Sequence, residues 1–147
     1  MDIENLLKLL KDHKVKFVII GAMAFPFYGY SRVTLDTDIF IEPAENNAKR
    51  ALSALKKFGY DVSDITVEDL LSKKLLIRQY SVETDIHPFV TGLTFDEVWK
   101  NKKTGKIGNL SVHFASLDDI IKMKKAAGRD KDKEDLKILN KLKKRKY

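Results

Sequence analysis

Residues 17–41 constrain the fold more than any other part of the chain. They read FVIIGAMAFPFYGYSRVTLDTDIFI, which predicts a buried strand, a turn at Gly21, a short helix and a second strand. The second strand carries Asp36 and Asp38 near its start. Alternate side chains of a strand point to the same face, so these two carboxylates must project together. Two carboxylates this close resist ionising together unless a cation lies between them. Because Mg²⁺ prefers oxygen ligands, the strand predicts a divalent cation site.

The turn at Gly21 supplies the second half of a phosphate site. The N-terminus of a helix offers unpaired N–H groups and the positive end of its dipole to an anion. A phosphate cradle at Gly21 and Ala22, beside metal-binding carboxylates, indicates metal-assisted phosphoryl or nucleotidyl transfer.

This arrangement resembles the polymerase-beta-like nucleotidyltransferase superfamily. The signature of that superfamily is Gly followed by Gly or Ser, then an Asp-x-Asp motif on a strand. Here it reads Gly21-Ala22, thirteen further residues, and Asp36-Thr37-Asp38. The run YGYSRVTLDTDI resembles the small prokaryotic branch, which contains minimal nucleotidyltransferases and AbiEii-type toxins. That branch commonly has an arginine four residues before the first aspartate, and Arg32 holds that position. The resemblance implies that Arg32 belongs to the nucleotide-binding set with Gly21-Ala22.

Two positions depart from the superfamily pattern. Ala22 replaces the usual Gly or Ser, so a hydroxyl that would touch a phosphate is absent. Thr37 replaces an apolar residue between the aspartates. The backbone cradle survives both changes. A catalytically silent module with the same fold, binding RNA or a partner protein, therefore stays open as an alternative.

A third acid is expected from a neighbouring strand, and Asp85 is the best candidate. Glu83 has the same strand parity and is the second choice. The resemblance implies that Asp36 and Asp38 bridge two Mg²⁺ ions, or Mn²⁺ as an alternative, while Asp85 holds the ion that activates the attacking hydroxyl. The plainer interpretation is that Asp36 and Asp38 are turn and strand-edge acids paired with Arg32, with Asp85 in a hairpin.

The segment 122–139, KMKKAAGRDKDKEDLKIL, adds an independent signal. It resembles the C-terminal pattern of the small branch, a Lys followed by Ala-x-Arg-x-x-Asp-x-x-Asp-Leu. The resemblance implies that Lys122 and Arg129 face the triphosphate or the acceptor, with Asp132 and Asp135 orienting them. Structural ion pairing is the alternative.

The positive charge is concentrated at the C-terminus. Of the net charge of +7, residues 122–147 contribute +8, from twelve Lys or Arg against four acids, and the first 121 residues contribute −1. A basic segment attracts polyanions such as RNA. A solvated terminal helix is the alternative, and an adaptor that binds nucleic acid through these lysines alone is a third functional hypothesis.

Composition restricts the class of protein. With 147 residues, 44% hydrophobic and 33% charged, the chain suits one soluble domain over residues 1–147. Absence of cysteine excludes disulfides and thiolate metal sites. The longest apolar stretch, 17–27, is shorter than the ~20 residues that a membrane helix needs. The acidic N-terminus does not resemble a signal peptide. We therefore expect a cytoplasmic protein with no membrane partner.

Hydrophobic periodicity and punctuation predict an α+β fold. The resemblance makes this the nucleotidyltransferase fold, a small mixed sheet flanked by helices, with a basic helical segment at 116–147. The expected helices are 3–15, 45–58, 94–101, 117–127 and one from residue 130, with strands at 16–21, 34–41 and 106–115 and a hairpin around Glu83 within 75–90.

The remaining candidate residues have modest signals. His87 shares strand parity with Asp85 and can line the cleft, although a histidine beside proline is more often structural. Trp99 is expected in the core, and the lysines at 8, 11, 14 and 16 are expected to solvate a helix face. No Ser-His-Asp or HExxH pattern exists, which excludes a serine hydrolase or a zinc protease of those classes.

These patterns and the resemblance together predict an Mg²⁺-dependent nucleotidyltransferase. It moves a nucleoside monophosphate from an NTP to an acceptor hydroxyl. The resemblance further implies a toxin–antitoxin or related defence system. The acceptor is then tRNA, another RNA or a protein, and a cognate antitoxin is a candidate partner.

Overall fold

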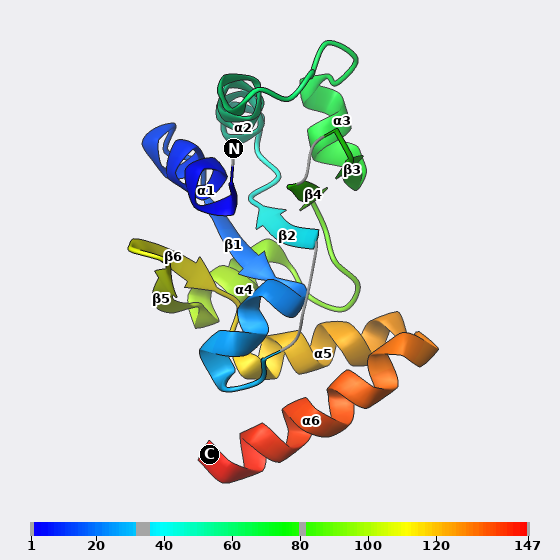
Figure 1. Cartoon of the computed structure of the whole chain (residues 1–147). Helices are drawn as coiled ribbons and strands as arrows, with labels where there is room; N and C mark the ends of the chain where they lie inside the picture. Colours follow the sequence, from blue (N-terminus) through cyan, green and yellow to red (C-terminus); the bar gives the residue numbers. More distant parts are fainter. Residues whose placement is uncertain (1, 32–35, 80–81, 147) are drawn as a thin grey trace.

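The computed structural model describes residues 2–31, 36–79 and 82–146 (Figure 1). Its strands form one six-stranded mixed sheet in the order β3-β4-β2-β1-β6-β5. The strands are β1 (Phe17–Ile20), β2 (Asp36–Ile41), β3 (Leu75–Ile77), β4 (Glu83–His87), β5 (Lys103–Ile107) and β6 (Leu110–Phe114). The helices are α1 (Ile3–Asp12), the 3-10 helix η1 (Gly21–Tyr28), α2 (Glu45–Phe58), α3 (Val67–Ser72), α4 (Phe95–Asn101), α5 (Leu117–Ala127) and α6 (Asp130–Lys146).

Strand β2 occupies the centre of the sheet and determines the register of the acids. It pairs antiparallel with β1, which sets Ile20 opposite Asp38. It pairs parallel with β4, which sets Asp36 opposite Glu83 and Asp38 opposite Asp85. Side chains that are direct partners on adjacent strands lie on the same face. The register therefore gathers four carboxylates on one face of β2 and β4.

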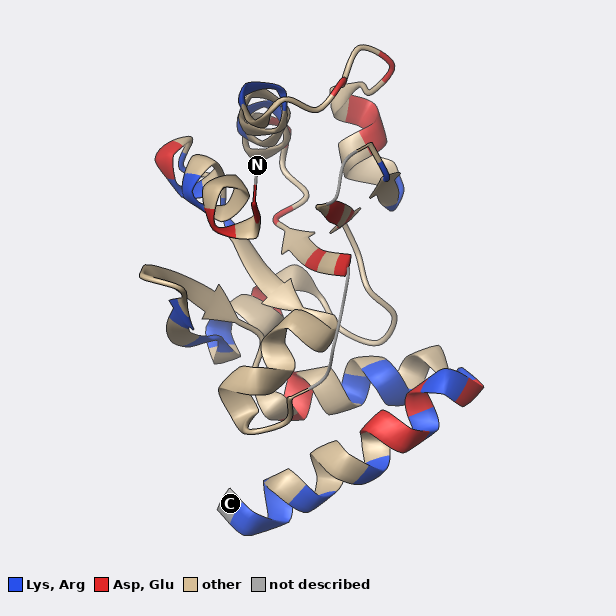
Figure 2. Cartoon of the chain, in the orientation of Figure 1, with Lys and Arg blue, Asp and Glu red and all other residues tan. Residues whose placement is uncertain are grey.

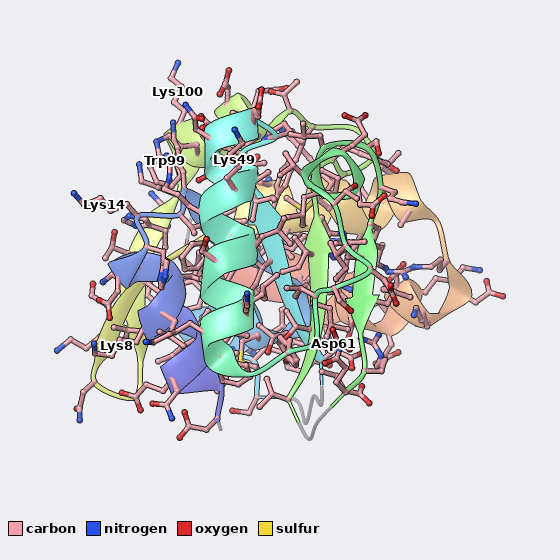
Figure 3. All side chains as sticks on the ribbon, turned by 90° about the horizontal axis from the view of Figure 1, so that it is seen from above. Lys8, Lys14, Lys49, Asp61, Trp99 and Lys100 are labelled. Atoms are coloured by element: carbon pink, nitrogen blue, oxygen red, sulfur yellow. The ribbon has the colours of Figure 1, made fainter. Side chains whose placement is uncertain are left out.

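Helices cover both faces of the sheet (Figures 1 and 3). Helices α1 and α2 lie on one side, and α5 and α6 lie on the other. All four residues of β1 are buried because this strand is covered on both faces. Helix α1 contributes its apolar stripe, with Leu6, Leu7 and Leu10 fully buried. This packing on both faces fixes the position of β1 and of β2, the strand that carries Asp36 and Asp38.

Glycines end two of the predicted helices. Helix α2 covers residues 45–58, as predicted, and ends where Gly59 adopts φ +116°. Helix α5 starts at Ser116, whose side chain accepts a hydrogen bond from the backbone N–H of Asp119, and ends at Gly128 with φ +62°. Glycine is the usual residue for a left-handed helix terminus. The α5–α6 turn is therefore fixed by sequence, and it places α6 against α5.

Three predicted boundaries were wrong. The stretch 106–115 is not one strand, because a turn at Gly108 (φ +60°) separates β5 from β6. Glu83 does not lie at a hairpin turn but opens β4. The first helix ends at Asp12 instead of residue 15, since Lys14 adopts a left-handed φ of +58°. None of the described helices is long and apolar enough to span a membrane.

Candidate active site

Three predicted aspartates lie together on the sheet. Asp36, Asp38 and Asp85 project from the same face of β2 and β4, while the intervening Thr37 and Thr84 are buried on the other face. Asp85 is 6% exposed, and Asp36 and Asp38 are half-buried. Figure 2 shows the acidic bands of β2 and β4 above the mixed acidic and basic turns of α5 and α6. We call Asp36, Asp38, Asp85 and the neighbouring Glu83 the acidic face.

Histidine joins this group from the end of β4. One donor atom from each of Asp38, Asp85 and His87 lies within 4.8 Å of the others. His87 Nε2 lies 2.9 Å from Asp38 Oδ1. Carboxylate oxygens with one imidazole nitrogen form a donor set that suits a divalent cation such as Mg²⁺ or Mn²⁺. The residues present therefore fit a metal site. His87 lies two residues after Asp85 on the same strand and so shares its face, and this signal in the sequence could have made His87 a stronger candidate metal ligand.

Arg78 is the cation that the sequence did not reveal. Its Nη1 donates to Asp85 Oδ1 at 2.6 Å, and its Nε lies 3.6 Å from Glu83 Oε2. The hydrogen bond to Asp85 raises the pKa of Arg78. Arg78 follows β3 and belongs to no motif, so only the hairpin geometry brings it to the acidic face. It partly balances carboxylates that would otherwise repel one another.

Crowding on the acidic face shows in the titration of Glu83. A hydrogen bond shared with Asp36, together with burial, raises the pKa of Glu83, although the nearby charge of Arg78 opposes the rise. Neighbouring carboxylates resist ionising together. Among the described residues, the four carboxylates of the acidic face thus outnumber the one arginine, Arg78, that contacts them.

Gly21 permits the close approach of η1 to the acids. It adopts φ +74°, and a Cβ atom at this position would lie 2.5 Å from Asp38 Oδ2. Such a contact is shorter than any real Cβ contact, so alanine here would displace the Asp38 carboxylate. Gly21 and Ala22 both line the pocket in front of the acids. The predicted phosphate cradle and the predicted metal ligands are therefore adjacent.

A buried ion network forms the opposite wall of the pocket, from α5 and α6. Lys124 Nζ lies 3.1 Å from Asp132 Oδ1 and 3.3 Å from Asp135 Oδ2. Arg129 binds Asp132 through two nitrogens, Nε at 2.8 Å and Nη2 at 3.2 Å. We call Lys124, Arg129, Asp132 and Asp135 the ion network. Lys124 also lies over the ring of Phe25, 5.3 Å from its centroid. The wall presents cations whose positions are fixed.

The ion network favours the ionised form of Asp132. Asp132 is 1% exposed and Asp135 is 4% exposed. Burial alone would raise the pKa of Asp132, but the hydrogen bonds from Arg129 and Lys124 outweigh it and hold the pKa below the ordinary value of 3.8. Tyr30 donates a further hydrogen bond from its hydroxyl to Asp135 Oδ1 at 3.1 Å.

Lys122 is not where the resemblance placed it. It is exposed and does not line the pocket, whereas Lys124 does. Helical residues advance by about 100°, so a residue two positions away faces almost the opposite direction. Ile120, Met123, Lys124 and Ala127 share the pocket side of α5. Arg129 lines the pocket as predicted, and Arg32 lies outside the described residues.

The two walls enclose a pocket of about 550 Å³. Phe89, which is 60% exposed, also lines it. Lys74 and Lys131 add positive charge to the lining. A pocket with acids on one wall and cations on the other suits an anion that binds together with a metal cation.

Sequence comparison assigns the family. The model of a family described as "nucleotidyl transferase of unknown function (DUF2204)" matches residues 1–147. The chain belongs to this nucleotidyl transferase family. No curated protein matches this nucleotidyltransferase in sequence.

A solved structure confirms the fold. The crystal structure of the lincosamide antibiotic adenylyltransferase LnuA with lincomycin bound matches with a TM-score of 0.64. The match covers 97% of this chain and 98% of LnuA at 16% sequence identity. The predicted nucleotidyltransferase fold is therefore confirmed. The assignment to a nucleotidyltransferase superfamily is confirmed by the family match over residues 1–147. The narrower minimal-nucleotidyltransferase or AbiEii-type branch stays a prediction.

Proposed function

We propose that this nucleotidyltransferase moves a nucleoside monophosphate from an NTP to an acceptor hydroxyl, with release of pyrophosphate, in an Mg²⁺-dependent reaction. The observation that carries the proposal is the convergence of Asp36, Asp38 and Asp85 opposite the cations of the ion network, across one pocket. Metal-dependent nucleotidyl transfer needs acids that hold a divalent ion and cations that hold phosphates.

The acidic face holds the metal in this proposal. Asp38, Asp85 and His87 supply one donor set, and Asp36 extends it along β2. One or two bound Mg²⁺ ions, or Mn²⁺, would polarise a phosphoryl oxygen and lower the pKa of the attacking hydroxyl. His87, through its contact with Asp38 Oδ1 at 2.9 Å, orients that carboxylate. If the metal ion binds Asp85 Oδ1, the hydrogen bond from Arg78 to that oxygen must break.

The triphosphate binds between η1 and the ion network. The backbone at Gly21 and Ala22 approaches it from one side, and Lys124 and Arg129 approach from the other. Asp132 and Asp135 are positioning residues, because they hold these cations in place. Arg32 completes the nucleotide-binding set by resemblance.

The proposed acceptor is tRNA or another RNA, or a protein, in a toxin–antitoxin or related defence setting. Support comes from the exposed Lys and Arg residues of α6, and Figure 2 shows blue bands along the C-terminal part of that helix. A surface of this sign attracts polyanions.

Label transfer tests the proposal. The protein is incubated with each labelled NTP, Mg²⁺ and total tRNA or cell lysate. We expect transfer that Asp38→Asn abolishes and that Asp64→Asn, an exposed acid away from the pocket, leaves unchanged. Transfer that persists in Asp38→Asn contradicts the proposed site.

Calorimetry tests the alternative of a catalytically silent module, which the missing hydroxyl at Ala22 favours. We expect an NTP to bind the wild-type protein only with Mg²⁺ present, and Asp36→Asn with Asp38→Asn to remove that dependence. Absence of both metal and nucleotide binding in the wild type supports the silent module.

A further inference from the structure

A second pocket lies at the other end of β1. Its volume is about 350 Å³. We call it the basic pocket, and its lining residues are Lys11, Lys14, Val15, Lys16, Phe17, Trp99, Ser111, Val112 and His113. Strand β1 runs from Phe17 at this pocket to Ile20 beside the active site. At ~3.3 Å per residue, the two sites are about 10 Å apart along the strand. The basic pocket is therefore separate from the site described above.

Positive charge gathers around the basic pocket without acids to balance it. None of the described residues that line it is acidic. Lys11 donates from Nζ to the backbone oxygen of Ser111 at 2.5 Å, so its charge is held there but not neutralised. Of the three lysines that line the pocket, Lys16 has an acidic partner among the described residues: its Nζ lies 3.2 Å from Glu42 Oε2. The pocket thus keeps a positive potential.

The aromatic wall adds two observations that point to an anion. Lys102 lies 4.1 Å from the centroid of the Trp99 ring, and Lys16 lies 4.8 Å from it. Burial first, and then the charges of Lys102 and Lys11, lower the pKa of His113. The contribution of these two lysines to the lowered pKa reflects the positive charge gathered beside His113. Figure 3 shows Lys14 and Trp99 on the side of the molecule that carries α1.

The cations extend beyond one pocket. Residues 8–16 and 100–106 hold eight lysines and one acid, Asp12, and Lys8 pairs with that acid at 2.8 Å. Lys100 and Lys103 are exposed at the end of α4 and the start of β5. A row of this kind fits successive phosphates of a chain better than one small anion.

We propose that the basic pocket binds the phosphodiester backbone of RNA, with Lys11 and Lys14 on one side and Trp99, which has Lys102 over its ring, on the other. This inference rests on the proposed function only in that the RNA is then the acceptor. The binding itself needs neither metal nor NTP. It assigns the direct phosphodiester contact to the α1–α4 side of the molecule, whereas the basic residues of α6 contribute only long-range attraction.

Intrinsic fluorescence tests the assignment directly, because Trp99 is the only tryptophan of the chain. A single-stranded RNA oligonucleotide is titrated into the full-length protein without metal or NTP. We expect quenching of Trp99 that weakens as salt rises. Lys11→Gln with Lys14→Gln should weaken binding about tenfold and reduce the salt slope by about 1.4, since each single-strand phosphate contact contributes about 0.7.

A charge-matched variant supplies the control. Lys141→Gln with Lys144→Gln removes the same charge from exposed positions on α6 and should change RNA affinity less than twofold. Asp38→Asn should bind RNA like the wild type, which separates this inference from the catalytic proposal. Thermal unfolding checks that each variant folds, and Lys102→Gln replaces the double variant if that one does not.

Three results overturn the inference. The first is an unchanged Trp99 signal at RNA concentrations where binding is otherwise detected. The second is an equal or greater loss of affinity in the α6 variant. The third is equal quenching by inorganic phosphate or ATP at the same concentration as RNA phosphate, which would make this a site for small anions.

Discussion

The two groups of carboxylates that line the active-site pocket balance their charge in different ways. On α6, Asp132 and Asp135 are almost fully buried, and both contact the Lys124 ammonium. On the acidic face, four carboxylates lie together. The cation in contact with them, Arg78, has a side chain that is 39% exposed. Buried acids need compensating cations within the fold. Among the residues that the structure describes, the ion network meets that need more fully than the acidic face does.

This difference separates scaffold from chemistry. Acids that are neutralised within the fold hold cations in place, and removing such an ion pair lowers the stability of the protein. Acids that are crowded and under-compensated cost stability and are retained for a ligand that brings charge. Substitutions in the two groups should therefore have opposite signatures in activity and in stability.

The largest expected effect is the loss of nucleotidyl transfer in Asp38→Asn and in Asp85→Asn. Losing a metal ligand forfeits several kcal/mol of transition-state stabilisation, which corresponds to about three orders of magnitude or more in rate. Without metal, each variant should unfold at the same temperature as the metal-free wild type or at a higher one, since one repelling charge is gone. Rate and melting temperature measured on the same samples check both halves. A melting temperature well below that of the wild type would break the comparison.

Next in size is the destabilisation expected for Lys124→Met. Removing the ammonium leaves two buried carboxylates without their shared cation, and such a change costs about 3–5 kcal/mol. Chemical denaturation measures the free energy of unfolding. Lys122→Met is the matched control, because Lys122 is exposed on the same helix and outside the pocket. It should change stability by less than about 0.5 kcal/mol.

Equal losses in the two lysine variants would contradict the assignment of Lys124 to the pocket. They would also restore the position that the resemblance gave to Lys122. The two lysine variants thus test which side of α5 faces the pocket as well as the contribution of the ion network to stability.

A smaller effect is expected from acid titration of Asp132. Its pKa in the folded protein lies below the ordinary value of 3.8. Asp132 therefore contributes stability above the unfolded pKa, and that contribution is lost as pH falls through the folded pKa. Between about pH 5 and pH 2 the wild type should lose more free energy of unfolding than Asp132→Asn. Parallel curves for the two proteins would show that the ion network does not hold Asp132 ionised.

Local sequence rules predicted the scaffold of the site well. Strand parity places Asp36 and Asp38 on one face, and a second strand with the same parity brings Asp85 beside them. Gly59 and Gly128 mark helix ends because glycine takes left-handed φ without strain. These features depend on nearest neighbours in sequence, so one sequence was enough to find them.

Features set by tertiary geometry were missed. Arg78 reaches Asp85 across a hairpin, and no spacing rule links the two residues. Strand β5 was not predicted, because KTGKI lacks the alternation of a half-buried strand and all five of its side chains are exposed or half-exposed. The basic pocket was missed because its lysines, at 11, 14 and 16, were assigned to a solvated helix face, and only the fold brings Trp99 and His113 beside them.

The smallest expected effect is a change in Mn²⁺ affinity in Arg78→Gln, which tests the charge balance of the acidic face directly. The guanidinium competes with a metal ion for Asp85 Oδ1, which it contacts at 2.6 Å. An ion pair with one exposed partner is worth up to about 1 kcal/mol, so its loss should tighten Mn²⁺ binding by no more than about fivefold. Titration calorimetry with Mn²⁺ measures the affinity, and Lys73→Gln, which removes an exposed pair with Asp69 on α3, should leave it unchanged. Weaker Mn²⁺ binding in Arg78→Gln would mean that the arginine positions Asp85 for the metal. The acidic face would then resemble the ion network, with a built-in cation that the site cannot lose.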